Sequence, residues 1–367
     1  MTRRKNILAG IFLTLICLLI VGVNVRVNRT PLLAEDNVDF VKATVTKVTG
    51  ESGQPQKVEA VITSGEHKGD TCQADNSNGY LYGADCKVGT KIIIQLSEYD
   101  GTLSGNVYGY DREIILYVLI GIFMLVLCLI GGWQGVRSAV ALVFTFVCII
   151  FLYIPMMYMG ASPFWSAVLV VFLTTVVSLY LIGGFTKKTF CAIAGSMAGV
   201  LIAGITASLF GKIGHISGYN VQDVESMIYV AQNSKLQVSG VLFSGILIAS
   251  LGAVMDVSMS VSSTMSELHE KNPDMGRKEL FRSGITVGKD MMGTMSNTLI
   301  LAFTGGSVNT LIMLYSYNLP YQQMINMYSL GIEILQGISG TLGVILTVPF
   351  VSLIAAFVIG NKSVDEC

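Results

Sequence analysis

Charged residues are scarce in this chain. Only 13% of its 367 residues are charged, whereas 52% are hydrophobic and the mean hydropathy is +0.64. An average soluble domain carries about 25% charged residues. The net charge is −1, and the sequence has no basic domain or aromatic–basic stripe, which excludes nucleic acid as a partner. The shortage of charge, together with long apolar runs, predicts a protein that crosses a membrane several times.

The signatures of the common enzyme classes are also missing. There is no G-x-x-x-x-G-K-[ST] loop, so ATP-driven pumping by this chain alone is unsupported. Neither H-E-x-x-H nor C-x₂-C occurs, so we predict no metal site and no cofactor. Asp256 and Asp290 have the rough placement of an intramembrane aspartyl protease, but their surroundings lack the Y-D and G-x-G-D signatures. We therefore expect no catalytic residues and no enzyme activity.

The chain begins with a basic cluster, TRRK, followed by an apolar run from Ile7 to Val25. A cleaved secretory signal has a shorter apolar core and a small-residue cleavage site, and the nearest site, Leu32-Leu33-Ala34, is poor. We predict that residues 1–37 form a cytoplasmic N-terminus and an uncleaved anchor helix.

Residues 38–110 differ in kind from the rest. The segments VDFVKATVTKV and TKIIIQLS are rich in β-branched residues, and turn residues separate them at SGEHKGD and DNSNGY. We predict a small extracytoplasmic all-β domain, with an OB-like barrel as the candidate fold. A disulfide between Cys72 and Cys86 would contribute roughly 3 kcal/mol in the chain-entropy model. Two free thiols are the alternative.

Seven apolar segments follow, each with the roughly 20 residues that cross the hydrocarbon. They lie near residues 112–131, 137–159, 163–184, 189–211, 239–262, 291–316 and 334–359. With the anchor, the predicted fold is an α-helical polytopic membrane protein of eight spans. Its seven-helix membrane domain covers residues 111–360, and a cytoplasmic tail covers residues 361–367.

The basic residues support one orientation of these spans. The short outer loops contain only Lys212 and Lys235. The segments on the other side contain Arg3, Arg4, Lys5, Arg137, Lys187, Lys188, Lys271, Arg277, Lys278, Arg282, Lys289 and Lys362. Because cytoplasmic loops carry the excess of Lys and Arg, both termini should lie in the cytoplasm and the β domain outside.

Two of the apolar segments carry polar side chains at helical spacing. The first set is Asp256, Ser260, Ser263 and Glu267, and the second is Asp290, Thr294, Asn297 and Thr298. On a helix, each set forms one stripe. A charge at the bilayer centre costs about 2.5–3.5 kcal/mol on insertion scales, so such stripes mark a site.

Two roles fit these stripes. In the first, the aspartates, hydroxyls and Asn297 line a wet path that binds a cation or a proton. In the second, Asp256 pairs with Lys289 and the hydroxyls bond back to helix carbonyls, so the stripes only hold helices together. Glu333, at the outer start of the last span, is either an interfacial residue or the guard of an outer entrance. The candidate pathway residues are Asp256, Ser260, Ser263, Lys289, Asp290, Thr294, Asn297 and Glu333.

Small residues recur along two other spans. The rows are Gly195, Gly199, Ala203 and Ala207, and Gly337, Gly340 and Gly343. Such rows let helix backbones approach closely in lipid, so we interpret them as packing seams, with a hinge or sliding surface as the alternative.

Three long segments carry a resemblance to a known family. They are GAVMDVSMSVSSTMSEL, ELFRSGITVGKDMMGTMSNTLILAF and EILQGISGTLGVILTVPF. They resemble the YibE/F family of bacterial multi-pass membrane proteins, over about residues 115 to 357. Gly288-Lys289-Asp290 matches the family's GKD or GRD entry to this span. The resemblance implies a bacterial plasma membrane location and no established activity.

The sequence therefore predicts a secondary transporter or permease of a small solute or ion. Its expected partners are the lipid bilayer, the solute or ion, and a second copy or a related membrane subunit. The alternative is a membrane scaffold or sensor that does not transport and whose β domain binds a partner.

Overall fold

The computed structural model describes residue 14 and residues 16–27, 38–77, 84–99, 102–220 and 224–360. The chain divides into two compact units, one of Met1–Arg29 with Gly131–Cys367, the other of Thr30–Ile130. The predicted cytoplasmic tail and the N-terminal basic cluster lie outside the described residues.

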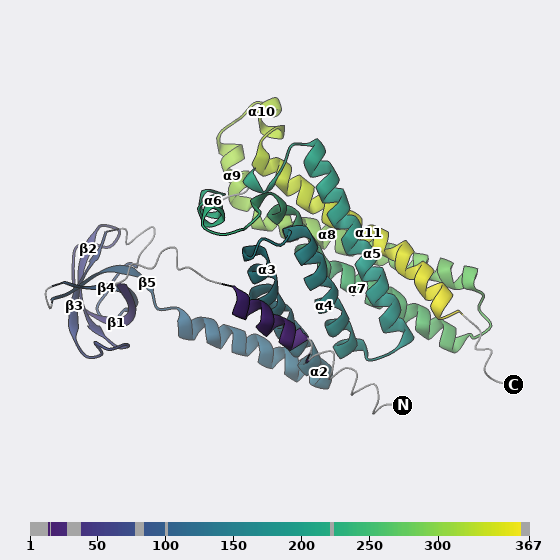
Figure 1. Ribbon diagram of the computed structural model, residues 1–367, viewed down its shortest axis with the longest axis horizontal. Helices are drawn as coiled ribbons and strands as arrows, with labels where there is room; N and C mark the ends of the chain where they lie inside the picture. Colours follow the sequence, from purple (N-terminus) through teal and green to yellow (C-terminus); the bar gives the residue numbers. More distant parts are fainter. Residues whose placement is uncertain are drawn as a thin grey trace. The chain divides into compact units, whose positions relative to one another are not determined.

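The smaller unit contains a closed barrel of five strands (Figure 1). The strands are β1 (Val38–Thr49), β2 (Gln56–Ile62), β3 (Thr71–Asn76), β4 (Lys91–Tyr99) and β5 (Thr102–Tyr110). Their order is β1-β2-β3-β5-β4, and only the β3–β5 pair is parallel. Along β2 the inward residues Val58, Ala60 and Ile62 are buried. This alternation gives the barrel its core, and the predicted small all-β barrel is confirmed.

Two buried amides hold one wall of the barrel. The Gln56 side chain accepts hydrogen bonds from the Cys86 amide (3.0 Å) and from the Asn76 amide group (3.2 Å). It also donates to the Cys86 carbonyl at 3.3 Å. Cys72 and Cys86 are both buried in this core, and both are free thiols in the structure. The disulfide between them stays a prediction.

The barrel is tied to the helix that follows it. The helix α2 (Glu113–Cys148) begins soon after β5 ends. Lys42 on β1 forms an ion pair with Glu113 and lies 3.9 Å from Asp111. The hydrogen bond to Glu113 is the main cause that raises the pKa of Lys42. These contacts fix the first turn of α2 against the barrel.

α2 contains a kink at Gly132, whose φ of 53° and ψ of −136° are readily adopted only by glycine. The helix continues through the π-helical segment η1 (Ile149–Tyr153) into α3 (Ile154–Tyr158). Predicted spans 112–131 and 137–159 therefore fall on one run of 46 residues, Glu113–Tyr158. At 1.5 Å per residue its path is about 69 Å, roughly twice the thickness of the hydrocarbon.

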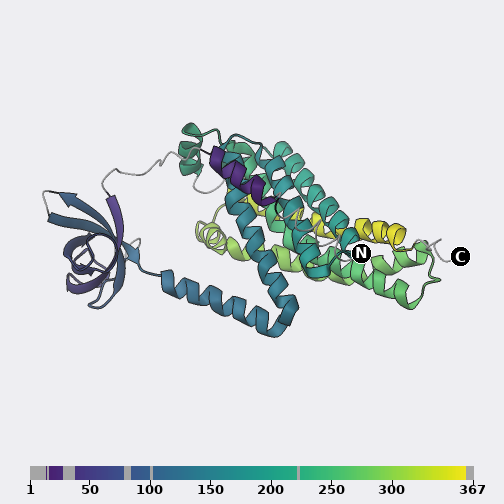
Figure 2. The same cartoon turned by 60° about the horizontal axis from the view of Figure 1, so that its bottom comes forward.

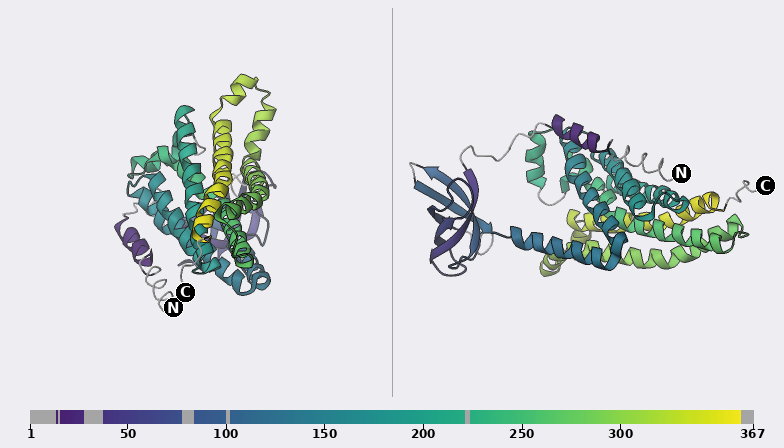
Figure 3. Two further views of the ribbon diagram at one scale, coloured as in Figure 1. Left: turned by 90° about the vertical axis from the view of Figure 1, so that its right-hand side faces the viewer. Right: turned by 90° about the horizontal axis from the view of Figure 1, so that it is seen from below.

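Four further long helices agree with predicted spans or extend them. They are α4 (Pro163–Gly183), α5 (Lys187–Ile213), α7 (Val241–Lys271) and α11 (Tyr328–Val358). The segment between α5 and α7 contains the short helices η2 (Gly218–Asn220), α6 (Val224–Gln232) and η3 (Val238–Gly240). In Figure 3, α11 lies between α5 and α8, and α7 packs against α4, α5, α8 and α11.

The predicted span 291–316 differs most from the structure. The helix α8 (Arg277–Gly306) starts well before residue 291, and a bend of 63° separates it from α9 (Val308–Ser316). The short helix α10 (Tyr321–Ile325) leads to α11. The early start has a physical reason, since Leu280, Gly284 and Gly288 repeat every four residues and are all buried.

The described residues contain five helices that are long and apolar enough to span a membrane, or six if α8 and α9 form one broken span. This is fewer than the eight spans that we predicted. Part of the difference is the merging of two predicted spans in the run Glu113–Tyr158. The other part is the anchor, of which the structure describes the short apolar helix Ile16–Arg26.

The predicted packing seams of α5 and α11 are confirmed for their central glycines, and the structure places the two rows against each other there. A Cβ atom added at Gly199 would lie 1.7 Å from the Thr347 hydroxyl oxygen and 3.0 Å from the Gly343 carbonyl. A Cβ at Gly343 would lie 2.7 Å from that of Ala203. Gly337 is different, because nothing lies within 4 Å of its added Cβ. The backbones of α5 and α11 therefore touch along the middle of the seam.

We expect Gly199→Val to destabilise the helical unit by about 1–3 kcal/mol, since the side chain must displace Thr347 and the α11 backbone. The measurement is thermal unfolding of the full chain in detergent. Gly245→Val on α7 is the matched control, because nothing lies within 4 Å of an added Cβ there. Equal loss of stability in both variants would contradict the seam.

The barrel thiols should be inert in the folded protein. Burial raises the pKa of Cys86 to about 11 and also raises the pKa of Cys72, so neither forms much thiolate at pH 8. We expect both to resist iodoacetamide at pH 8 and to react after unfolding in reductant, as read by peptide mass spectrometry. Rapid labelling of the folded chain at either position would contradict this burial. Labelling after unfolding that requires reductant would show a bridge between them.

Candidate functional site

The helix α8 packs against its neighbours with one side only. Leu280, Gly284, Gly288 and Leu299 are buried on that side, against α7 and α11. The opposite side is exposed in the middle of the helix. We name these exposed residues the α8 polar face: Lys289, Asp290, Gly293, Thr294, Asn297 and Thr298. Figure 2 shows α8, in green, running beside α11, in yellow.

The helix α7 has a narrower exposed strip. Most of its residues are buried or half-buried, Ser260 and Ser263 among the latter, but Gly252 and Asp256 are exposed. An added Cβ at Gly252 would meet nothing within 4 Å, and the same holds at Gly293 on α8. Both exposed strips therefore combine an acidic residue with open space one turn away.

Contacts between helices set the level of Asp256. At one level, an added Cβ on Gly284 would lie 2.5 Å from the Met265 sulfur and 2.7 Å from the Ser352 hydroxyl. At a second level, Gly340 of α11 meets both Leu299 and Ser250. Between these levels, Asp256 lies at about the height of Gly293, within roughly one turn of Asp290. The structure thus places the two aspartates at similar depth.

This depth is far from the ends of the helices. An added Cβ on Gly288 would lie 2.1 Å from a Val348 methyl carbon of α11. On α11, the run from Ile334 to Ile359 contains no charged residue, and Val348 lies near its middle. We predicted that Lys289 and Asp290 open a span, but they come about three turns after the helix begins at Arg277. They lie beside the most apolar part of the neighbouring helix.

The charged groups of this site have no protein partner among the residues that the structure describes. No ion pair joins Asp256 to Lys289, and neither aspartate side chain accepts a hydrogen bond. The threonines behave differently. Thr294 donates to the Met291 carbonyl at 3.1 Å, and Thr298 donates to the Thr294 carbonyl at 2.9 Å. The threonine hydroxyls donate to carbonyls of their own helix, whereas the charged side chains of this site have no such partner among the described residues.

Glu333 belongs to another part of the helical unit. It lines a hollow of about 230 Å³ beside the end of α8, α9 and the start of α11, together with Ile300, Phe303, Thr304, Ser307, Leu311, Leu330, Ile334, Gly337 and Ile338. Gly340 marks the level of Ser250, and Glu333 lies about two turns further toward the α10 end. The structure therefore does not bring Glu333 to the α8 polar face.

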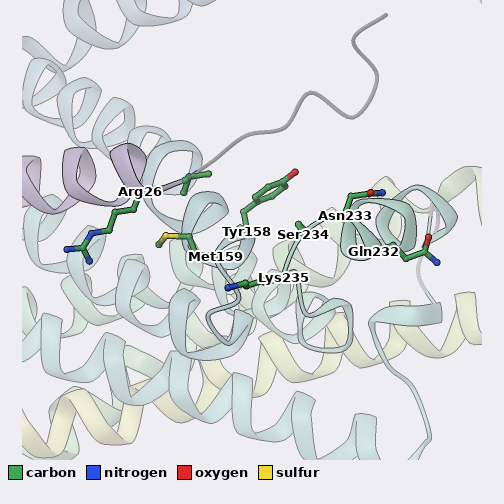
Figure 4. Close-up of a pocket in the computed structure, with 8 residues that line it drawn as sticks. Arg26, Tyr158, Met159, Gln232, Asn233, Ser234 and Lys235 are labelled. Atoms are coloured by element: carbon green, nitrogen blue, oxygen red, sulfur yellow. The ribbon is translucent and has the colours of Figure 1, made fainter.

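A larger hollow, of about 640 Å³, was missed from the sequence. It is lined by Arg26, Val27, Tyr158, Met159, Gln232, Asn233, Ser234 and Lys235 (Figure 4). These residues come from three distant segments, so no spacing pattern relates them. The sequence signal is that Lys235 is one of two lysines in the short loops that we predicted to lie outside.

The donor set of the α8 polar face suits proton or cation chemistry. The α8 polar face holds one carboxylate (Asp290), one ammonium (Lys289) and one amide (Asn297) within about two turns of the helix. Asp256 of α7 lies at a similar height. Across the described part of the chain, no group of three or more His, Cys, Asp or Glu side chains is placed to hold a metal ion. Carboxylate and amide oxygens of this kind can exchange a proton or bind a hydrated cation.

Residues 119–361 match the family model described as YibE/F-like protein. No curated protein and no solved structure matches the chain significantly. The match includes α7, α8 and α11, and hence Asp256 and the α8 polar face, whereas the barrel lies outside it. The apolar helices and the family are those of a membrane protein. The chain belongs to the YibE/F-like family, as the resemblance in its sequence predicted.

Proposed function

We propose that this protein is a secondary transporter or permease of a small solute or ion in the plasma membrane. Its path would be formed by the α8 polar face and the exposed strip of α7 around Asp256. The observation that carries this proposal is the exposure of Asp256 without a partner, level with the middle of α8. Lys289 and Asp290 share this exposure.

Lipid is a poor environment for such a surface. Each charge placed at the bilayer centre costs about 2.5–3.5 kcal/mol on insertion scales. Asp256, Lys289 and Asp290 would together forfeit several kcal/mol if acyl chains covered them. Water or another polar surface must therefore contact these charges. A water-filled route is the arrangement in which the charges would also take part in transport.

The chemistry of the route follows from its groups. Asp256 and Asp290 would bind a proton or a cation, and Lys289 would offset one of the negative charges. Open space at Gly252 and Gly293 leaves room for a hydrated ion beside the carboxylates. Because the chain has no nucleotide-binding loop, the driving force would be an ion gradient. The proposal includes no enzymatic step.

The proposed topology has eight spans, with both termini in the cytoplasm and the barrel outside. The run Glu113–Tyr158 is long enough for two crossings, with Gly132 at the turn between them. α8 and α9 would form one broken span. The distribution of Lys and Arg supports the orientation.

A second candidate function is a membrane scaffold or sensor. Phe40 and Tyr108 are 59% and 64% exposed on the barrel, with ring centroids 5.2 Å apart in an edge-on arrangement. Exposed aromatic pairs are enriched at protein interfaces, so the barrel would bind a partner. In that case the α8 polar face would be covered by a second copy or a related membrane subunit, and it would be dry.

Water access separates the two candidates. In a variant whose seven native cysteines are replaced, we expect Thr294→Cys and Ser260→Cys to react with a membrane-impermeant thiol reagent. Membrane vesicles of both orientations would be labelled, so that the test also shows from which side of the membrane each position is accessible. Leu346→Cys is the matched control. Leu346 is exposed on α11 at about the level of Asp290 but in an apolar setting, so lipid should protect it.

Protection of positions 260 and 294 from both sides would contradict the path and favour the scaffold. Equal reaction at positions 294 and 346 would mean that the reagent reports on disorder of the sample rather than on a wet face, and it would also count against the path.

The second test is Asp256→Asn. We expect it to reduce gradient-driven flux of H⁺, Na⁺ or K⁺ into proteoliposomes by about tenfold or more, since the amide neither binds a proton nor attracts a cation. Glu270→Gln on the same helix removes an equal charge near its end and should leave flux unchanged. A pH-sensitive dye and isotope uptake are the measurements. Unchanged flux in Asp256→Asn, or no flux in the unaltered protein with any of the three ions, would contradict the proposal.

A further inference from the structure

The larger hollow of the helical unit has walls from three segments. Arg26 and Val27 come from the end of the N-terminal helix, and Tyr158 and Met159 from the end of α3. Gln232, Asn233, Ser234 and Lys235 come from the end of α6 and the turn after it. A volume of about 640 Å³ is within the range of roughly 300–1,000 Å³ that small-molecule sites occupy.

Specific contacts hold these walls in place. Asn24, two residues before the end of the N-terminal helix, donates hydrogen bonds to the Ile20 carbonyl (2.8 Å) and to the Phe151 carbonyl (2.5 Å). The Gln237 amide donates to the Gly160 carbonyl at 3.1 Å. The hollow is therefore formed by segments that are fixed to one another, and it is not merely a gap between loops.

Gly160 brings Lys235 against the end of α3. Its φ of +92° lies in the region that favours glycine, and an added Cβ would lie only 2.9 Å from the Lys235 Cβ atom. This close approach fixes the base of the lysine side chain at the wall of the hollow. Nearby, Ser234 accepts a hydrogen bond from the Leu236 amide at 3.2 Å, which shapes the turn.

Among the residues that the structure describes, the lining is cationic and contains no acid. Arg26 and Lys235 are its charged residues, and Tyr158, Gln232 and Ser234 add neutral polar groups. In the described part of the chain, neither Arg26 nor Lys235 forms an ion pair. In Figure 4 the side chains of Arg26 and Lys235 extend to the same side of the view, on either side of Met159. Two cations that line one hollow give it a positive potential, which attracts an anion.

We propose that this hollow binds a phosphate group, either of a free phosphate compound or of a lipid headgroup. A phosphate group, with one or two negative charges and several acceptor oxygens, matches two cations and neighbouring neutral donors better than a single carboxylate does. Arg binds such oxygens through its planar fork, and Lys binds them as a point charge. This site is separate from the α8 polar face, and the proposal does not depend on transport.

The test uses the full chain, purified in a neutral detergent without phosphate. Inorganic phosphate is titrated by calorimetry. In a second arm, native mass spectrometry measures retention of phosphatidylglycerol from nanodiscs that also contain phosphatidylcholine. We expect Lys235→Gln and Arg26→Gln each to weaken binding about tenfold or more, as expected when a charged hydrogen-bond donor is lost. Lys235→Arg should restore most of it.

Lys212→Gln is the matched control, because it removes the other lysine of the short outer loops without touching the hollow. Binding of inorganic phosphate with this pattern of variants supports a free phosphate compound as the ligand. The same pattern in the lipid arm alone supports a headgroup. Binding in neither arm, or equal binding by Lys235→Gln, Lys212→Gln and the unaltered protein, would overturn the proposal. Ion flux is not part of this readout, so its outcome is independent of the transport test.

Discussion

Hydrocarbon cannot solvate a charge, and this constraint shapes the helical unit of the protein. α11 satisfies this constraint, because it carries no charged residue from Ile334 to Ile359. It packs centrally between α5 and α8. α8 does not satisfy the constraint, because Lys289 and Asp290 lie beside the middle of that apolar run. A helix that violates the rule at this depth must have its charges contacted by water or protein. The position of α8 at the edge of the packed helices makes such contact available.

Close packing elsewhere explains why the charges face outward. Gly284 and Gly288 let α8 lie directly against Ser352 and Val348 of α11, so no side chain with charge fits on that side. On the opposite side, the added Cβ of Gly293 meets nothing. The same side carries the threonines whose hydroxyls are already satisfied by helix carbonyls. The helix thus separates a packed glycine side from an open polar side, on which Lys289, Asp290 and Asn297 make no side-chain hydrogen bond or ion pair with the described residues.

Much of the architecture was accessible from the sequence, for reasons that particular elements make clear. Alternating apolar residues predicted the barrel strands, and hydropathy located α4, α5 and α11. Hydropathy failed for α8, because the segment from Arg277 to Asp290 is charged and lies outside the predicted apolar span 291–316. Its helical repeat of Leu280, Gly284 and Gly288 was visible, but glycine adds nothing to an apolar count. A search for the regular spacing of small residues would have located the first turns of α8.

The candidate sites divide in the same way. Asp256 and the α8 polar face were predicted because their residues share single helices, where spacing translates directly into position. Their depth was harder to predict, since it depends on which residue of α8 meets which residue of α11. The hollow with Arg26 and Lys235 had no such signal. Its walls meet only because Asn24 reaches Phe151 and Gln237 reaches Gly160, contacts between segments that are far apart in the chain.

The α8 polar face and the hollow that contains Glu333 both border α8. The α8 polar face ends at Thr298, and the hollow that contains Glu333 begins at Ile300. α8 then ends at Gly306, where the Ser307 amide bonds back to the Phe303 and Thr304 carbonyls at 3.1 and 3.2 Å. Irregular backbone at membrane depth is tolerated where it borders protein or a water-filled cavity, and here Ser307 itself lines the hollow. The α8 polar face, the hollow that contains Glu333 and the break at Gly306 thus follow one another along α8. The hollow that Glu333 of α11 lines therefore borders the same helix that carries Asp290.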